Sequence, residues 1–134
     1  FALAADSAGG AAALLVLSVG YLNSRKQFGR PLAMFQALKH RCADLKAQTS
    51  AAEALLLDGV DRGDAVAAKM AKQLACAVYA RVGEEAVQLH GGIAMTAEHV
   101  CHRYLKRALL NEHLGQRKDA YALDIATALL SNAP

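Results

Sequence analysis

The 134-residue sequence contains no tryptophan, only two prolines, and 5% aromatic residues. Strands are enriched in aromatic and β-branched residues, and no segment shows the alternation of apolar and polar residues that a half-buried strand requires. Alanine and leucine instead supply much of a hydrophobic content of 54%. Residues of this kind favour closely packed helices.

Long apolar runs and a strong excess of one charge are also absent. The longest apolar region, around Ala11–Leu17, is far shorter than the roughly 20 residues that span a bilayer, and no basic segment precedes it as in a secretory signal. The formal net charge is only +3, and the basic residues form small groups typical of solvated helix faces. We therefore expect neither a membrane nor a nucleic acid as partner.

The sequence has only three cysteines, and none of them is paired in a C-x-x-C motif. Cys42, Cys76 and Cys101 each lie in a helical pattern, so we expect buried thiols in a reducing compartment rather than a disulfide framework.

Apolar residues recur at helical spacing along the first half of the chain. A mostly buried helix is predicted from Ala2 to about Ser24, although Gly9-Gly10 should weaken it locally. After it, Gly29 suits the left-handed residue that follows a helix, and Pro31 suits the first turn of the next one. The second helix is predicted over 34–56.

Two further turns and three further helices complete the pattern. The segment Asp58–Asp64 is predicted to be a turn, with Asp64 as the N-cap of a third helix that runs to Gly91-Gly92. A fourth helix is predicted to start with Thr96 as cap and Glu98 in its first turn. Its inward-facing residues would be Val100, Tyr104, Leu105, Ala108 and Leu109. Gly115 interrupts it, and Asp119–Leu130 predicts a fifth, shorter helix. Because the connections are short, we expect one all-α domain over residues 1–134, an antiparallel up-and-down bundle of four main helices plus a short C-terminal helix.

Several potential metal ligands lie within one short stretch. They are His90, His99, Cys101, His102, Glu112 and His113. Di-iron bundles use Glu-x-x-His pairs, which this sequence lacks, as it lacks H-E-x-x-H and paired-cysteine spacings. We therefore expect no metal site and assign these histidines to helix caps and the surface. Gly-x-Ser-x-Gly and P-loop motifs are absent too.

Three local features do not fit a plain bundle. Arg25-x-x-Phe28-Gly29 places a guanidinium and an aromatic ring at a helix end, and Gln36 follows near the start of the next helix. Gln88-Leu89-His90-Gly91-Gly92 adds a second amide and a stretch of bare backbone. Together they offer a bidentate cation for phosphate, amide hydrogen bonds and approachable backbone N–H groups. A ligand with a diphosphate and an adenine would use all three, although a Gly-Gly pair alone also fits a simple helix end.

At these residues the sequence resembles the acyl-CoA dehydrogenases. The matching blocks, in family order, are Tyr21–Leu32, Phe35–Asp44, Ala68-Lys69, Ala86–Ile93 and Thr96-x-Glu98. The resemblance corresponds to the C-terminal helical domain of that family. Family members also have an N-terminal helical domain and a central β-domain, which are not among these 134 residues.

The resemblance implies an enzyme that uses FAD to desaturate an acyl-CoA between its α and β carbons and passes the electrons to an electron-transfer flavoprotein. It further implies dimer or tetramer contacts through this domain and a contact with the FAD of a neighbouring subunit. Arg25 would meet the pyrophosphate and Phe28 would pack beside the cofactor. Gln36, Gln88 and the backbone through Leu89, His90, Gly91 and Gly92 would complete the contact. The expected location is the bacterial cytoplasm, or the mitochondrial matrix in a eukaryote.

The sequence differs from most of the family at the position of the catalytic base. Many members carry Tyr-Glu-Gly-Thr after the fourth helix, and the aligned stretch here places Leu114 in the glutamate position. A leucine cannot accept a proton, and Glu112, two residues away, points about 200° around a helix from that position. Some members place the base on the first helix of this domain, at a position just before Phe1. We therefore assign no catalytic residue, and expect the isolated chain to be inactive.

The stretch from His90 to Gly115 is most similar to a branch of the family that acts on bulky acyl groups such as sterol side chains. Mixed-subunit assemblies occur there, so a non-catalytic partner subunit remains the alternative.

Overall fold

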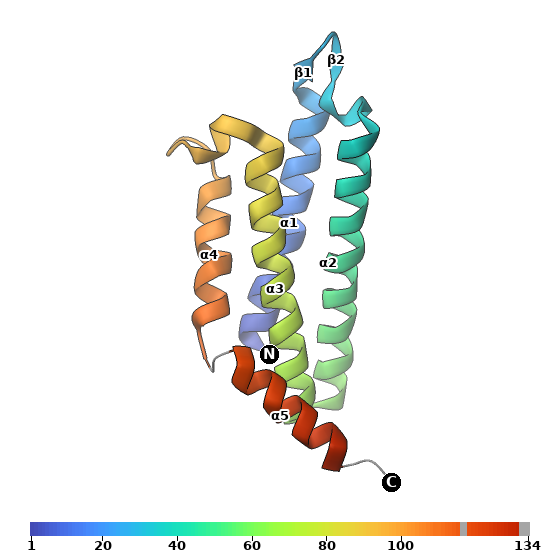
Figure 1. Ribbon diagram of the computed structural model, residues 1–134, viewed down its shortest axis with the longest axis vertical. Coiled ribbons are helices and arrows are strands. Elements are labelled where there is room, and N and C mark those ends of the chain that lie inside the picture. The colour runs from blue at the N-terminus through green and yellow to red at the C-terminus, as the bar shows by residue number, and fades with distance from the viewer. Residues whose placement is uncertain (116–117, 132–134) are drawn as a thin grey trace.

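The computed structural model describes residues 1–115 and 118–131 and contains five α-helices in that part of the chain. They are α1 (Ala2–Ser24), α2 (Gln36–Arg62), α3 (Ala65–His90), α4 (Cys101–His113) and α5 (Lys118–Ser131). The first four run antiparallel to their chain neighbours, and α5 crosses one end of the bundle (Figure 1). The predicted all-α up-and-down bundle with a short C-terminal helix is therefore confirmed.

Helix α3 is the centre of the bundle, because it packs against α1, α2, α4 and α5. Small buried residues allow close helix contact, among them Ala8 and Ala11 of α1 and Ala75 of α3. The Gly9-Gly10 pair does not interrupt α1, and Gly10 has a packing role. A Cβ atom at Gly10 would lie 2.4 Å from Cζ of the buried Tyr79, so only glycine leaves room for that ring.

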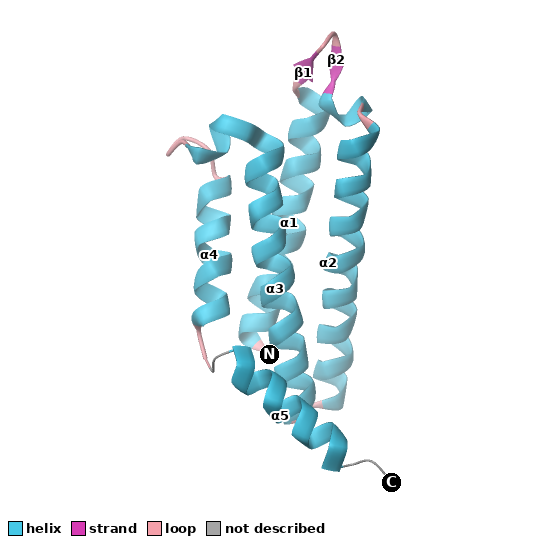
Figure 2. Ribbon diagram, viewed as in Figure 1, coloured by secondary structure: helices cyan, strands magenta, loops and turns pink. Residues whose placement is uncertain are grey.

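The connection between α1 and α2 corrects the expectation that the chain has no strands. Strands β1 (Lys26–Gln27) and β2 (Arg30–Pro31) form a small antiparallel hairpin (Figure 2). Its two central residues, Phe28 and Gly29, have φ angles of 53° and 75°, as a two-residue type I′ turn requires. Gly29 is left-handed as predicted, but it belongs to this turn and not to the end of α1. Pro31 precedes the 3₁₀ turn η1 (Leu32–Met34), after which α2 begins.

Two other predicted boundaries have different outcomes. Asp64 caps α3 as predicted, since its carboxylate accepts a hydrogen bond of 2.6 Å from the backbone N–H of Ala67. Thr96 does not cap α4. A 3₁₀ turn, η2 (Gly91–Met95), follows α3, and the Thr96 hydroxyl donates back to the carbonyl of Ile93. Helix α4 therefore begins only at Cys101.

The side chains of α4 and the cysteines are buried only in part as the sequence predicts. Ala108 is buried, whereas Leu109 is 41% exposed and does not face the core. Asn111 is fully buried instead. All three cysteines are free thiols, of which Cys76 and Cys101 are buried and Cys42 is half-buried.

Helix α1 is longer and more apolar than the run Ala11–Leu17 indicated, because Asp6 is its only charged residue. Among the described residues it is the one helix that could cross a membrane by length and composition. This is weak support for a membrane span, since the core helix of a bundle passes the same test. Its buried residues, Leu14 and Leu15 among them, belong to the common core of the bundle.

Candidate functional site

The predicted site residues gather at one end of the bundle, which we call the hairpin end (residues 21–36 and 88–99). Arg25 follows the last residue of α1, Gln36 is the first residue of α2, and Gln88–His90 form the last turn of α3. Figure 1 shows these ends side by side beneath the hairpin and η2. Segments far apart in the sequence therefore lie at the same end of the bundle.

Tyr21 holds the ends of α1 and α3 together. Its ring stacks on the imidazole of His90 with a centroid separation of 4.4 Å, and its hydroxyl donates to the His90 carbonyl at 3.3 Å. The sequence alone does not predict this role of Tyr21, although Tyr21 lies one helical turn before Arg25 and hence on the same side of α1. The contact fixes the position of Arg25 relative to Gly91-Gly92.

Phe28 is held in an unfavourable conformation at the tip of the hairpin. A positive φ is an outlier for a bulky residue, and its side chain is 88% exposed. The ring forms a T-shaped pair with Phe35, at a centroid separation of 6.1 Å, and the Arg30 guanidinium lies 4.1 Å above the Phe35 ring. An exposed aromatic side chain on a strained backbone suggests a role outside this chain.

Gly91 and Gly92 leave open space. Gly91 has a φ angle of 67°, so its own backbone conformation favours glycine. Gly92 has no such constraint, and a Cβ atom added at either position would have no atom of the described residues within 4 Å. Unlike Gly10, Gly92 therefore borders open space, and a ligand could approach its backbone closely.

The hairpin end is also basic. Arg25, Lys26 and Arg30 are exposed, and the first turn of α2, Gln36 to Lys39, carries a cation and no carboxylate. Cations at a helix N-terminus are unfavourable because the helix dipole is positive there. An anion bound at this end would relieve that repulsion.

The remaining candidate residues differ in what they can offer. Gln88 and Gln36 are exposed, whereas Leu89 and His90 are 6% and 4% exposed. Only the backbone of Leu89 and His90 is therefore available to a ligand at this surface. Burial lowers the pKa of His90, so its imidazole is neutral at neutral pH.

Three of the potential metal ligands come together. His90, His99 and Cys101 each place a ligand atom within 4.8 Å of the others, because η2 turns the chain back against the end of α3. His102 and His113 instead pair with the carbonyls of His99 and Leu109. The spacing of these residues in the sequence does not reveal this triad.

The family's base position lies at the opposite end of the bundle. Leu114 follows the last residue of α4, far from the hairpin (Figure 1). A carboxylate on the neighbouring α1, that of Asp6, accepts hydrogen bonds from Arg107 and Asn111. The Arg107 and Asn111 side chains lower the pKa of Asp6, which makes it a poor proton acceptor.

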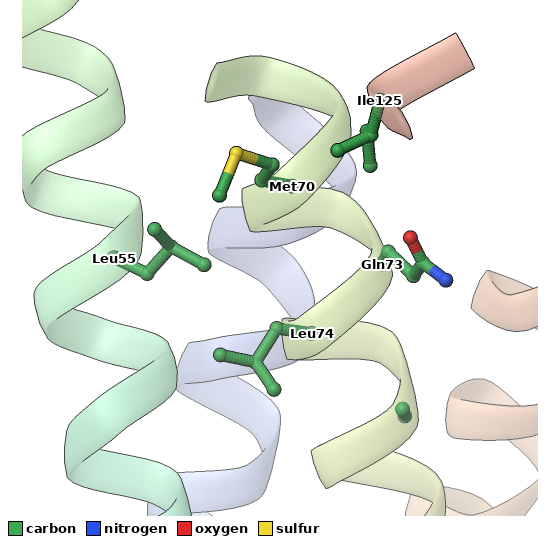
Figure 3. Close-up of a pocket in the computed structure, with 6 residues that line it drawn as sticks. Leu55, Met70, Gln73, Leu74 and Ile125 are labelled. Carbon is green, nitrogen blue, oxygen red and sulfur yellow. The ribbon is translucent and has the colours of Figure 1, made fainter. Parts of the chain in front are cut away.

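One surface hollow among the described residues is lined mainly by apolar side chains and offers no such chemistry. It has a volume of about 460 Å³ and lies between α2, α3 and α5. Figure 3 shows Leu55, Met70, Leu74 and Ile125 around it, with Gln73 as the polar member. This apolar hollow lies near the α5 end and shares no residue with the hairpin end.

The fold and the hairpin end define an antiparallel helical domain with an open, basic surface suited to an anionic ligand. The sequence model of the C-terminal domain of acyl-CoA dehydrogenase matches residues 1–130. The chain therefore belongs to the acyl-CoA dehydrogenase family.

Individual relatives agree with this. The chain is 44% identical over 106 residues to acyl-CoA dehydrogenase IpdE2 of Mycolicibacterium smegmatis, a match that covers 79% of this chain and 34% of that protein. The structure of butyryl-CoA dehydrogenase from Megasphaera elsdenii superposes with a TM-score of 0.90 at 33% identity, covering 96% of this chain and 35% of that one. The FAD complex of PigA gives a TM-score of 0.87 at 27% identity, with 97% and 35% covered. The chain thus spans about a third of the length of these relatives.

Proposed function

We propose that the hairpin end binds FAD within an acyl-CoA dehydrogenase, an enzyme that desaturates an acyl-CoA thioester between its α and β carbons. Family membership and the similarity to an FAD complex support this assignment. The observation that carries it is the gathering of the exposed Arg25, Gln36 and Gln88 with the open backbone of Gly91-Gly92 at one end of the bundle. The Tyr21–His90 stack joins the end of α1, which Arg25 follows, to the end of α3.

The residues present fit the diphosphate portion of FAD. Arg25 is the cation for the pyrophosphate, because its planar guanidinium can donate two parallel hydrogen bonds to phosphate oxygens. Phe28 offers an aromatic surface, and the amides of Gln36 and Gln88 can donate and accept. The backbone of Leu89–Gly92 can approach the cofactor closely. Bound FAD supplies the acceptor for the hydride from the β carbon, and these residues bind and orient it, in the site of a neighbouring subunit.

The base that would remove the proton from the α carbon of the acyl-CoA must also be assigned. Leu114 cannot serve, so we infer that the base comes from another segment and that these 134 residues alone are inactive. We propose an electron-transfer flavoprotein as the electron acceptor of the enzyme. The proposed assembly is a homo- or hetero-oligomer, and the proposed location is the bacterial cytoplasm.

Leu114 also favours a second candidate function. With Leu114 in the base position and Asp6 engaged by Arg107 and Asn111, the domain fits a non-catalytic subunit of a mixed-subunit dehydrogenase. In that assembly the hairpin end either still binds the partner's FAD or is vestigial.

The test is the flavin affinity of the intact enzyme that carries this domain. Arg25→Ala should weaken FAD binding by about tenfold to a hundredfold, since a hydrogen bond to a charged group contributes about 1.5–3 kcal/mol. Flavin absorbance per protomer and titration of the flavin-free protein with FAD measure the change. Arg62→Ala, an exposed arginine near the opposite end of α2, is the matched control and should leave affinity unchanged. Equal flavin content in Arg25→Ala and the unmodified enzyme would favour the vestigial reading, and an intact enzyme that takes up no FAD would refute the proposal.

A further inference from the structure

The His90, His99 and Cys101 triad is a second site that the proposed cofactor contact does not use. The side chains of His90 and Cys101 are 4% and 0% exposed, whereas His99 is half-buried and open to solvent on one side. The two imidazole rings lie 4.6 Å apart between centroids, and Cys101 Sγ is 3.4 Å from His90 Nδ1. Residues from α3, the following loop and the start of α4 thus converge beneath the surface.

The hydrogen bonding of His90 leaves one ring nitrogen with a free lone pair. Its Nδ1 lies 2.8 Å from the carbonyl oxygen of Ala86, which can only accept, so the proton is on Nδ1. The lone pair is then on Nε2, which is buried and has no hydrogen-bond partner among the described residues. Metal-binding histidines commonly donate their other nitrogen to a backbone carbonyl in this way.

We propose that His90, His99 and Cys101 bind a transition-metal ion of the Zn²⁺ type. Two imidazoles and one thiolate suit this class of ion, and three protein ligands leave a fourth position open to water. The thiol proton of Cys101 leaves to solvent as the Cys101 Sγ–metal bond forms. Ligand atoms in a tetrahedral site lie about 3.5 Å apart, and potential ligand atoms of the three side chains lie within 4.8 Å of one another. Side-chain movements that bring His90 Nε2 to the ion would complete the site.

The site is placed to stabilise the hairpin end. An ion there would join the last turn of α3 to the start of α4 across η2, on either side of Gly91-Gly92. It would do so whether or not the domain binds FAD, so this inference does not depend on the proposed function.

Cobalt(II) is the probe, because a cobalt–thiolate bond gives a charge-transfer band in the near ultraviolet and tetrahedral cobalt gives intense visible bands. The full chain, reduced and treated with chelator, is titrated with Co²⁺ and then with Zn²⁺ as competitor. We expect one equivalent to bind with both signatures and Zn²⁺ to displace it. Cys101→Ser should abolish the thiolate band, and His99→Ala should weaken binding at least about 100-fold, the upper range for loss of an outer-shell partner.

Matched variants separate this site from adventitious binding. Cys42→Ser and His113→Ala remove a thiol and a histidine outside the triad and should leave the titration unchanged. Circular dichroism confirms that Cys101→Ser and the half-buried His99→Ala remain folded. Absence of a thiolate band in the unmodified chain, or a band that persists in Cys101→Ser, would overturn the proposal.

Discussion

The two ends of the bundle satisfy their polar groups in opposite ways. At the hairpin end, Arg25, Phe28 and Gln88 are exposed and Gly92 borders open space. Toward the other end, a group of five polar residues, of which Ser7, Cys76 and Asn111 are buried, is satisfied largely within the chain. We call it the Asn111 network; it consists of Asp6, Ser7, Cys76, Arg107 and Asn111. One end is therefore completed largely by its own side chains, whereas the other leaves polar groups free for the ligand that we propose.

The Asn111 network joins α1, α3 and α4. Asn111 donates through Nδ2 to Asp6 at 2.6 Å and to Ser7 at 3.0 Å. The Ser7 hydroxyl lies 3.3 Å from Cys76 Sγ, and Cys76 donates to the carbonyl of Asn111 at 3.6 Å. Asn111 Oδ1 is buried without a partner among the described residues, so the two Nδ2 contacts set the orientation of the amide.

The largest expected effect is that of Asn111→Ala. The change removes a hydrogen bond to a charged carboxylate and a second one to Ser7, and it opens a small cavity. We expect a loss of about 2–4 kcal/mol in the free energy of unfolding, measured with denaturant at fixed protein concentration. Asn23→Ala, at an exposed position whose amide donates to the Val19 carbonyl, should change the free energy of unfolding by less than about 0.5 kcal/mol. Similar losses in the two variants would remove the distinction between the ends.

The sequence predicted most of the fold because helical periodicity is a local signal. The limits of α1 and the Asp64 cap follow from apolar spacing and cap chemistry alone. The sequence does not predict the hairpin, because two-residue strands are too short to show alternation. The predicted Thr96 cap is wrong because η2 intervenes between α3 and α4.

The site was predicted as a set of residues but not as a geometry. The motifs named Arg25, Gln88 and Gly92, and the bundle topology brings their segments to one end. The sequence could not show that Tyr21 joins them, or that His90 and Cys101 meet. These contacts depend on how η2 folds back, which no periodic pattern encodes.

A smaller effect of opposite sign is expected at the hairpin tip. Phe28→Asn replaces a bulky side chain in the left-handed region with a residue that tolerates it, in an Asn-Gly pair that type I′ turns prefer. Because Phe28 is 88% exposed, little packing is lost, and we expect unfolding to require about 1 kcal/mol more free energy.

The same variant should bind FAD less tightly in the intact enzyme, since the aromatic surface is gone. A matched change, Gln27→Asn, leaves the turn residues unaltered and should not raise stability. If Phe28→Asn instead lowers the free energy of unfolding, the positive φ of Phe28 does not strain the hairpin, and this argument for a ligand contact fails.

The smallest expected effect is the dependence of stability on pH through Asp6. Hydrogen bonds from Arg107 and Asn111 lower its pKa below the ordinary value of 3.8. The unfolded chain therefore binds this proton first, so the contribution is fully present above about pH 4 and is lost as pH falls through the folded-state pKa. Because the carboxylate is 41% exposed, solvent screens the interaction and the acid limb should be shallow. Asp6→Asn should flatten that limb in unfolding curves measured across acidic pH, whereas Asp44→Asn, at an exposed position on α2, should leave it intact. An unchanged limb in Asp6→Asn would mean that Asn111 satisfies the network through Ser7 alone, and that the ionised carboxylate contributes nothing to this end.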